Sequence, residues 1–487
     1  MARLKARLEG MNAEPRPQFP PAAAYRDTLY RPPAPWPVSP TRALWRAIST
    51  FERDLITLLP SEAYRGPLDA KLGVSRRSIF LINNPETVQR MMGPDRALFP
   101  KNDLMVGALS PLVGEGLFVS EGAVWERQRR MIDPAFAHMR VNRAFAHMAA
   151  AMDDGIARLD RAAAAATPLS LEAEMSGLTA DMIFRTIFSE TLDGSDAARV
   201  FDAFARFQRA VANVELRHLL LSPAWTEVRQ PRPAREAAAE IRRTVGAMLD
   251  ARRAAAARGQ RGDDIAGDVI AARDPETGEG FSREEMLDQL GVFFLAGHET
   301  TASALTWALF ILSQQPETVA RIRAEIAATL DGGGEAPLTA GGVKRLAFTR
   351  AVFREALRLY PPVTFLARVA AEDVTIGDLA MPRGAMVLIS PWTIQRHEAL
   401  WPAADRFDPD RFLGNREGEV PAGAYLPFGG GPRLCIGVAF AMLEATLILA
   451  AILRRYDIEV ERPDRVRPVA RLTTRPARDI MVRLRRL

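Results

Sequence analysis

The segment FGGGPRLCIG, residues 428–437, carries the strongest indication of the fold of this 487-residue chain. It contains the single cysteine of the chain, Cys435. The glycines before it permit backbone conformations that are closed to other residues and let the backbone approach a flat ligand closely. Residues 436–453 carry a single charge, Glu444, and predict a helix buried in the core. The sulfur is therefore expected at a helix N-terminus, where free N–H groups and the helix dipole favour a thiolate.

Arg433 adds a fixed cation to the same loop. A thiolate held at a glycine-rich turn is suited to bind iron, and a thiolate ligand donates electron density to haem iron. One alternative is a phosphate-binding glycine-rich loop, but no Gly-Lys-Ser/Thr follows the glycines. The other is that a lone cysteine serves only as a small buried apolar residue.

The segment resembles the haem-binding signature of the cytochrome P-450 family, F-x-x-G-x-R-x-C-x-G, at all five fixed positions: Phe428, Gly431, Arg433, Cys435 and Gly437. The resemblance covers about residues 41–487 and implies a mainly α fold with a minor β region. It implies haem b (iron protoporphyrin IX) between a long central helix and the helix that follows the cysteine loop. Cys435 would bind the iron, and the haem site would include Phe428, Gly429 and Ala296.

The clearest predicted helix covers residues 282–315. Ser282 and Glu285 form a Ser-x-x-Glu capping box at its start. Pro316 predicts its end. The middle of this helix is apolar on every face, so we expect it to pass through the interior.

Within this helix, residues 296–301 read AGHETT. Gly297 is unfavourable in a helix interior, and the Thr300 hydroxyl can bond back to a carbonyl, so a kink with room for a small ligand is expected. The His-Glu pair is also found in zinc protease helices, but Ala302 occupies the position of the second histidine that such a helix needs. The resemblance implies that Thr300 and Glu299 handle protons for bound oxygen.

Two further sets of residues match the family in the expected order. Glu355 and Arg358 are three apart on one face of a helix with apolar flanks, which indicates a buried ion pair. Taken alone, such a pair is usually a solvated surface pair. The resemblance implies that Arg411 completes a structural Glu-Arg-Arg triad, although Asp410 stands where the family usually has glutamate.

Trp125 and Arg129 are four apart on one helical face, a spacing that also fits an ordinary amphipathic surface helix. The resemblance places this pair over a haem propionate, together with Arg433, Arg368 and Lys101.

The rest of the chain is mostly helical by pattern. Residues 1–40 are rich in proline and predict an extended or partly disordered arm, followed by a single haem domain over residues 41–487. Apolar residues recur at helical spacing through 41–60, 122–190, 197–212 and 233–257, and alternating segments near 364–390 and 456–483 predict strands.

The predicted function is a haem-thiolate monooxygenase that uses O₂ to hydroxylate a lipophilic substrate such as a fatty acid or terpenoid. The substrate class follows from apolar candidate pocket segments, 104–118, 293–296, 363–366 and 472–474. Electrons would come from a separate ferredoxin or flavodoxin with its reductase, since the sequence shows no second nucleotide- or flavin-binding region. The net charge of +5 and the arginines at 127, 129, 130 and 433 suit an acidic partner.

The remaining expectations concern location and alternatives. With one cysteine no disulfide forms within the chain, and the N-terminal residues lack a signal-peptide core, so a cytoplasmic location is expected. We expect no membrane anchor and no nucleic acid partner. Two alternatives remain: a peroxide-driven peroxygenase, against which the Glu299–Thr300 pair argues, and a haem-binding protein without turnover.

Overall fold

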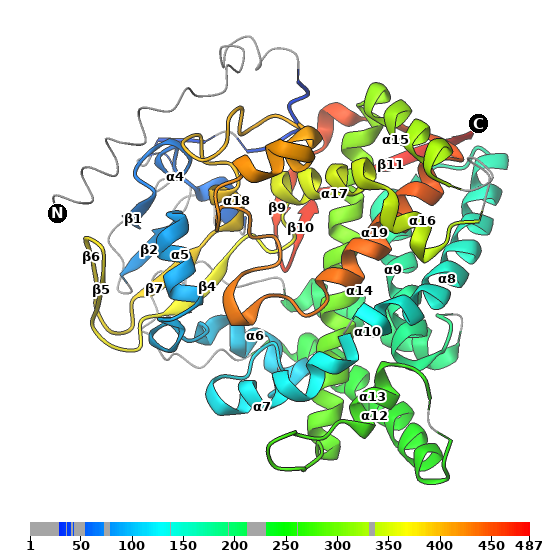
Figure 1. Cartoon of the computed structure of the whole chain (residues 1–487), viewed down its shortest axis with the longest axis horizontal. Helices are drawn as coiled ribbons and strands as arrows, with labels where there is room; N and C mark the ends of the chain where they lie inside the picture. The colour runs from blue at the N-terminus through cyan, green and yellow to red at the C-terminus, as the bar shows by residue number, and fades with distance from the viewer. Residues whose placement is uncertain are drawn as a thin grey trace.

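The computed structural model is mainly helical with a few small sheets, which confirms the predicted fold class. The largest sheet lies to one side of the helices, whereas the C-terminal strand lies on the opposite side (Figure 1). The structure describes these residues: 29–35, 37–39, 42, 54–72, 78–136, 138–192, 194–211, 230–260, 262–330 and 337–487.

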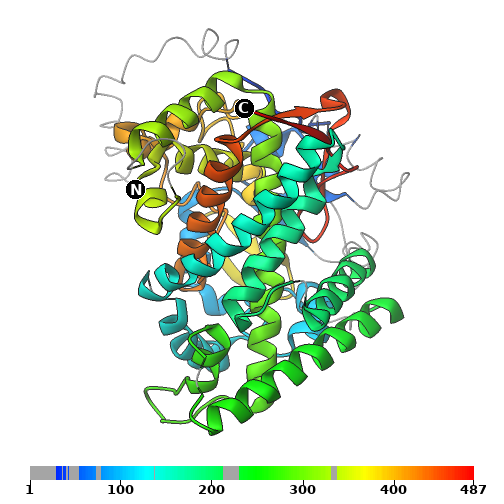
Figure 2. The same ribbon diagram turned by 90° about the vertical axis from the view of Figure 1, so that its right-hand side faces the viewer.

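The central helix, α14 (Arg283–Ser313), runs through the middle of the molecule (Figure 2). Ser282 caps it, and both hydrogen bonds of the capping box with Glu285 are present, as predicted. The helix ends two residues earlier than predicted, because the backbone turns before Pro316, which opens α15 (Pro316–Thr329). Nearly every residue of the middle of α14 is buried, as expected for a helix that crosses the core.

The helix predicted over 122–190 is divided into three. A short 3-10 turn that contains Pro134 separates the first two helices, and the strand β3 (Leu169–Ser170) separates the second from the third. Pro134 lacks the N–H of a regular helix, which explains the first break. The three helices are α7 (Gly122–Ile132), α8 (His138–Ala164) and α9 (Leu171–Phe188).

The helices predicted after residue 190 are also present. The apolar run after the cysteine forms α19 (Val438–Leu453), and the helix with the Glu355–Arg358 pair is α17 (Ala347–Leu359). The remaining helices are α4 (Glu62–Arg65), α5 (Pro85–Met92), α6 (Asp103–Val113), α10 (Ser195–Val211), α12 (Arg232–Ala257), α13 (Ile265–Ala271), α16 (Ala340–Arg345) and α18 (Pro391–Ile394).

A four-stranded sheet joins distant parts of the chain in the order β1-β2-β7-β4. The strands β2 and β7 are parallel, whereas the other two pairs are antiparallel. The strands of this sheet are β1 (Asp69–Leu72), β2 (Ile79–Ile82), β4 (Leu366–Val369) and β7 (Met386–Ile389). The smaller sheets use β3 together with β5 (Val374–Ile376), β6 (Leu379–Met381), β8 (Tyr456–Val460), β9 (Pro468–Ala470), β10 (Thr474–Pro476) and β11 (Met481–Arg486).

The described part of the N-terminal arm is extended and lies against the end of α17. The Tyr360 hydroxyl donates to the Pro33 carbonyl at 2.5 Å, and the Phe407 N–H donates to the Tyr30 carbonyl at 2.9 Å. Residues 1–28, and most of the helix predicted over 41–60, fall outside the described residues. No helix in the described ranges has both the length and the hydropathy that a bilayer crossing needs.

Candidate functional site

The cysteine loop depends on two glycines with positive φ. Gly431 has φ +62°, and a Cβ on it would lie 2.2 Å from the carbonyl oxygen of Met92 at the end of α5. Gly429 has φ +73°, but a Cβ on it would lie 3.6 Å from its nearest neighbour, Met92 Cε. The loop closes through the Cys435 N–H, which donates to the Phe428 carbonyl at 3.0 Å. Gly431 is therefore required by sterics as well as by conformation.

The Cys435 sulfur lies just before the start of α19, as expected. The side chain keeps exposed surface although protein atoms surround it closely, a combination that suits a sulfur covered by a large ligand. Burial raises the pKa of the thiol above its ordinary value, against the opposing effects of the Gly437 N–H and the Arg129 charge. The prediction that this loop favours a thiolate is therefore wrong for the protein by itself. The effect of burial on the pKa of the thiol is larger than the effect of the helix N-terminus, and Arg433 is directed to Glu121 instead of the sulfur.

Arg433 instead forms an ion pair with Glu121 at the start of α7. Its guanidinium also donates to the Ser120 carbonyl at 3.1 Å and lies 4.3 Å from the centre of the Trp125 ring. The Lys101 ammonium donates to the same Ser120 carbonyl at 3.1 Å.

Lys101, Arg368 and Arg433 form a half-buried cation cluster around one carboxylate, Glu121. A backbone bridge pairs Lys101 with Arg368. Burial and the neighbouring Arg433 lower the pKa of Lys101 to about 7, against the Glu121 charge. Burial likewise lowers the pKa of Arg368 to about 10, with Arg433 adding to the effect. Three cations that share one acid favour further anions, which is the property required to hold the two propionates of haem.

Arg129 does not join this cation cluster. It pairs with Asp133 at 2.6 Å and donates to the Leu434 carbonyl at 2.9 Å. The structure thus brings Trp125 to Arg433 but directs Arg129 to the backbone of the cysteine loop. The two residues share a helical face, as predicted, yet their contacts differ.

Residues 296–301 of α14 are continuous α-helix. The Thr300 hydroxyl donates to the Ala296 carbonyl at 2.6 Å, the back-bond that the sequence indicated. A Cβ at Gly297 would lie 2.7 Å from Cδ1 of Ile183 on α9. Close packing of α9 therefore accounts for this glycine, and no break in the helix is needed to explain it.

Glu299 lies in a buried polar cluster. Its carboxylate accepts from the Thr473 hydroxyl at 2.6 Å and from Arg475 Nε at 2.8 Å, with a further contact from Gln208 on α10. Arg475 also pairs with Glu172 at 2.8 Å. Burial alone would raise the pKa of Glu299, but the Arg475 charge and these hydrogen bonds outweigh burial and lower it below its ordinary value.

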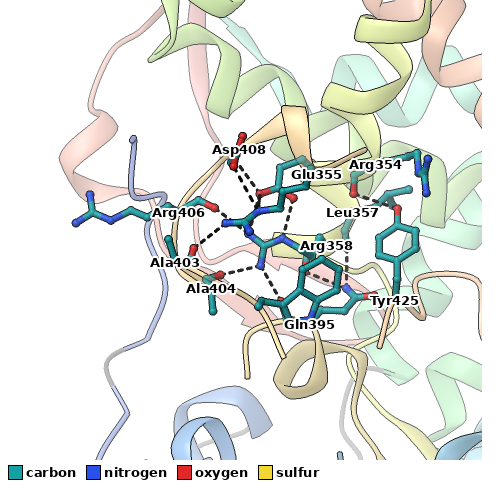
Figure 3. Close-up of polar contacts among 12 residues, drawn as sticks. Arg354, Glu355, Leu357, Arg358, Gln395, Ala403, Ala404, Arg406, Asp408 and Tyr425 are labelled. Carbon is teal, nitrogen blue, oxygen red and sulfur yellow. Dashed lines mark hydrogen bonds and ion pairs between the residues drawn. The ribbon is translucent and has the colours of Figure 1, made fainter. Parts of the chain in front are cut away.

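The structure brings the Glu355–Arg358 pair and Arg411 together in the core. Figure 3 shows Glu355 and Arg358 with their partners. Arg358 forms two 2.7 Å hydrogen bonds to Glu355 and donates to three carbonyls, those of Gln395, Ala404 and Arg406. The Glu355 carboxylate also lies 3.4 Å from Arg411 and accepts from the Asp408 N–H at 2.9 Å. These contacts fix the segment 404–411 that leads to the cysteine loop.

Sequence reasoning missed two residues of this site, Glu121 and Arg475. Both are charged residues that meet their partners only through tertiary contacts, and neither stands at a recognisable spacing from them. The sequence did show Glu444 as the single charge of an apolar run. It did not show which residues surround Glu444.

Comparisons with known proteins agree with this geometry. Residues 70–482 match the model of the family described as Cytochrome P450. The chain is 37% identical to cyclooctatin synthase of Streptomyces melanosporofaciens, over 82% of this chain and 84% of that protein. It is 35% identical to cyclooctat-9-en-7-ol 5-monooxygenase of the same organism, over 86% of this chain and 86% of that protein. It is 33% identical to pentalenene oxygenase of Streptomyces avermitilis over 85% of this chain and 89% of that protein.

A similar solved structure is the crystal structure of a cytochrome P450DA heme domain. It has a TM-score of 0.75 and 27% identity, covering 86% of this chain and 90% of that one.

Proposed function

Since the chain belongs to the cytochrome P450 family, we propose that this haem monooxygenase hydroxylates a neutral, largely hydrocarbon, cyclic substrate of the terpenoid class. Its cofactor is haem b, and its reaction uses O₂, electrons from redox partners and an organic substrate. The observation that carries the substrate class is the set of relatives, whose names specify pentalenene, an alkene, and cyclooctat-9-en-7-ol, an unsaturated alcohol.

The residues near segment 296–301 of α14 support a neutral substrate over a fatty acid. Phe293 on α14 is buried and packs edge-on against Phe136 with ring centres 5.0 Å apart. Arg475, which follows the candidate pocket segment 472–474, is already paired with Glu172 and Glu299. It therefore has no unpaired charge to attract a substrate carboxylate. An apolar pocket binds a hydrocarbon through burial of its surface.

The residues at the site have separate roles in the proposed mechanism. Cys435 would bind the iron, and Lys101, Arg368 and Arg433 would hold the propionates. When bound, the haem activates O₂ for insertion into a C–H bond, with the thiolate donating electron density to the iron. The Thr300 hydroxyl donates to the Ala296 carbonyl, and by turning away from that carbonyl it would hand protons to the reacting oxygen.

Glu299 remains our candidate partner of Thr300 in proton handling. Its carboxylate is ionised and occupied by Arg475 and Thr473, so a proton reaches it only if these contacts loosen.

The proposed electron donor is a ferredoxin or flavodoxin that docks on the face formed by α7 and the cysteine loop. The arginines expected to attract it are each paired within the chain: Arg127 with Glu285, Arg129 with Asp133, Arg130 with Asp274, and Arg433 with Glu121. Val124 and Leu434 are 47% and 44% exposed, and each is next in sequence to a member of the Trp125–Arg433 stack. Apolar contact at these two residues therefore complements charge in docking.

Docking is tested with Val124→Glu in the haem-loaded enzyme. Its rate of reduction by a surrogate ferredoxin should fall severalfold, whereas Leu487→Glu, at a residue that is 59% exposed elsewhere, should leave the rate unchanged. Equal rates in both variants would exclude this face. We also propose a cytoplasmic location, where reduced ferredoxins or flavodoxins are present, and cell fractionation tests it.

Turnover of pentalenene with a surrogate ferredoxin and reductase tests the function. A hydroxylated product that requires reductant supports a monooxygenase, whereas product formed with peroxide alone favours a peroxygenase. Absence of product from any hydrocarbon probe, with products from fatty acids, would overturn the substrate class. Cys435→Ser should lose the thiolate band of the reduced carbon monoxide adduct; retention of that band contradicts the ligand assignment.

A further inference from the structure

We propose that a cavity at the start of α14 binds a carboxylate that carries an apolar chain, at a site separate from the haem. The cavity has a volume of about 880 Å³, within the roughly 300–1,000 Å³ that is usual for small-molecule sites. It lies about 25 Å along the helix axis from Thr300, at 1.5 Å per residue, so a molecule bound there does not occupy the haem pocket. The site is independent of the proposed reaction.

The cavity lies where three helices and a loop come together. The end of α12, the end of α13 and the start of α14 form three of its walls. These helices contact one another and meet near the lower end of the molecule in Figure 1. The loop that leads from α13 to α14, together with one residue of α7, completes the lining. Each wall therefore comes from a different element of the fold.

The loop over residues 272–281 is held to α7, so its wall of the cavity is fixed in place. Asp274 is 1% exposed, and its carboxylate accepts from Arg130 of α7 at 3.3 Å. Arg127 of α7 donates to the Gly280 carbonyl at 3.1 Å. A wall that is already ordered lowers the entropic cost of binding a ligand.

Arg273 presents a guanidinium to the cavity. It donates to the carbonyls of Ile270 and Ala272 at 3.2 and 2.7 Å, and both bonds use Nη1. A backbone bridge pairs Arg273 with Gly280, where a Cβ would lie 2.8 Å from Nη1, so the glycine leaves room for the head group. Among the residues that the structure describes, Arg273 forms no ion pair with a carboxylate. Its Nε and Nη2 donors therefore remain for a ligand.

Arg253 of α12 is a second cation of the cavity. It lies 3.7 Å from Asp250, and its side chain is 43% exposed. Asp250 already accepts two hydrogen bonds from Arg283, at 2.9 and 2.7 Å. Because these shorter bonds engage both carboxylate oxygens, Arg253 keeps most of its hydrogen-bonding capacity for a ligand.

The charges that line the cavity call for one negative charge in the occupant. Arg127 and Glu285 neutralise each other as a pair at 2.6 Å. Arg253 and Arg273 then share the cavity with one further carboxylate, that of Glu279, which leaves a surplus of one positive charge. A carboxylate carries one negative charge and fits the fork of a guanidinium, whereas a phosphate monoester carries nearly two negative charges at neutral pH. The site therefore favours a carboxylate.

The rest of the lining calls for an apolar body. Phe281 and Met286 are 5% and 6% exposed and belong to the main core. Ile270, Ala256 and Ala257 line the same cavity. These side chains present hydrocarbon surface, so a chain attached to the carboxylate is stabilised by leaving water. Dodecanoate combines both properties and is the probe of the site.

Isothermal titration calorimetry of the haem-loaded enzyme with dodecanoate tests the proposal. Wild type should bind dodecanoate at one site without a change in the haem absorption spectrum. Arg253→Gln and Arg273→Gln should each weaken binding at least about tenfold, because each removes charge-assisted hydrogen bonds to the carboxylate. The control is Arg235→Gln, at an exposed arginine of α12 outside the cavity, which should bind as wild type does.

Two further comparisons separate the head group from the chain. Dodecanol lacks the carboxylate and acetate lacks the chain, so each should bind at least about tenfold more weakly than dodecanoate. Ala256→Phe fills the apolar part of the cavity and should weaken dodecanoate binding by a similar factor. Unchanged circular dichroism spectra and melting temperatures of the ligand-free variants show that each loss is a loss of binding.

Three results would overturn the proposal. The first is equal affinity for dodecanoate in wild type and in both arginine variants. The second is a change in the haem spectrum that accompanies binding and persists in those variants, which would place dodecanoate in the haem pocket. The third is the absence of binding at millimolar dodecanoate. Calorimetry needs no turnover, so a failure of the proposed hydroxylation would leave this test unaffected.

Discussion

Replacing Arg358 with methionine should strongly destabilise the protein. The Arg358→Met variant keeps most of the volume of the side chain but removes its charge and its five hydrogen bonds to Glu355 and to three carbonyls. Arg358 and Glu355 both have 0% side-chain exposure. Among the described residues, the carboxylate left behind would keep Arg411 and the Asp408 N–H as its partners. Breaking a buried ion pair from one side costs about 3–5 kcal/mol.

That loss is a large part of a typical free energy of unfolding of about 5–15 kcal/mol. Because the same contacts hold the segment that leads to Cys435, haem content should fall together with stability. The assay is urea denaturation of the purified proteins, combined with haem content per protein.

The control is Arg199→Met on α10. Arg199 forms an i,i+3 pair with Asp196 of the same spacing, but its side chain is 53% exposed. Its loss should cost less than about 0.5 kcal/mol, because exposed pairs contribute little. The double variant Glu355→Gln/Arg358→Met neutralises the stranded carboxylate and should recover about 1–2 kcal/mol. If Arg358→Met falls within about 1 kcal/mol of Arg199→Met, the argument from burial is refuted.

Three further predictions concern Thr300, Gly431 and Glu444. Thr300→Ala should keep haem and substrate binding but divert electrons to peroxide, whereas Thr300→Ser should restore coupling; equal coupling in wild type and Thr300→Ala would sink the role of the hydroxyl. Gly431→Ala should lose stability and haem, because its Cβ would lie 2.2 Å from the Met92 carbonyl oxygen. Gly429→Ala, with a positive φ but no clash, should lower the free energy of unfolding by only about 1–2 kcal/mol, and equal losses in the two variants would contradict the steric argument. Because burial raises the pKa of Glu444, the folded state holds a proton that the unfolded chain releases, so the free energy of unfolding should fall as the pH rises from 4.5 to about 8, by up to about 1.4 kcal/mol per pH unit. Glu444→Gln should remove this slope, and parallel pH profiles of wild type and variant in denaturation experiments would contradict the prediction.

Local rules account for much of the fold. The capping box at Ser282 and the stop before Pro316 place α14 to within two residues, because helix ends are determined by neighbours in sequence. The spacing of Glu355 and Arg358 and their apolar flanks similarly indicated a buried pair, which the structure contains.

The remaining features depend on partners that are distant in sequence. The partner of Arg433 is Glu121 rather than the sulfur, and the partner of Glu299 is Arg475 from β10, pairings that no sequence spacing reveals. Gly297 was expected to allow a kink in the helix. The structure gives another reason for a glycine at this position, because Ile183 of α9 occupies the space that a side chain would need. The pKa of Cys435 was misjudged because the degree of burial is set by tertiary packing.

The contact between Gly431 and Met92 also bears on the order of assembly during synthesis. These residues are separated by most of the chain, as are the parallel strands β2 and β7 near them. Contacts between such distant segments require a large loop to close first, and they form late in folding. Because the ribosome releases the N-terminus first, α5 must wait for the cysteine loop until nearly all of the polypeptide has emerged. Cofactor capture through this loop is therefore a step of the finished chain, and nascent chains stalled just after residue 435, with the loop still inside the ribosome, should carry no thiolate-bound haem.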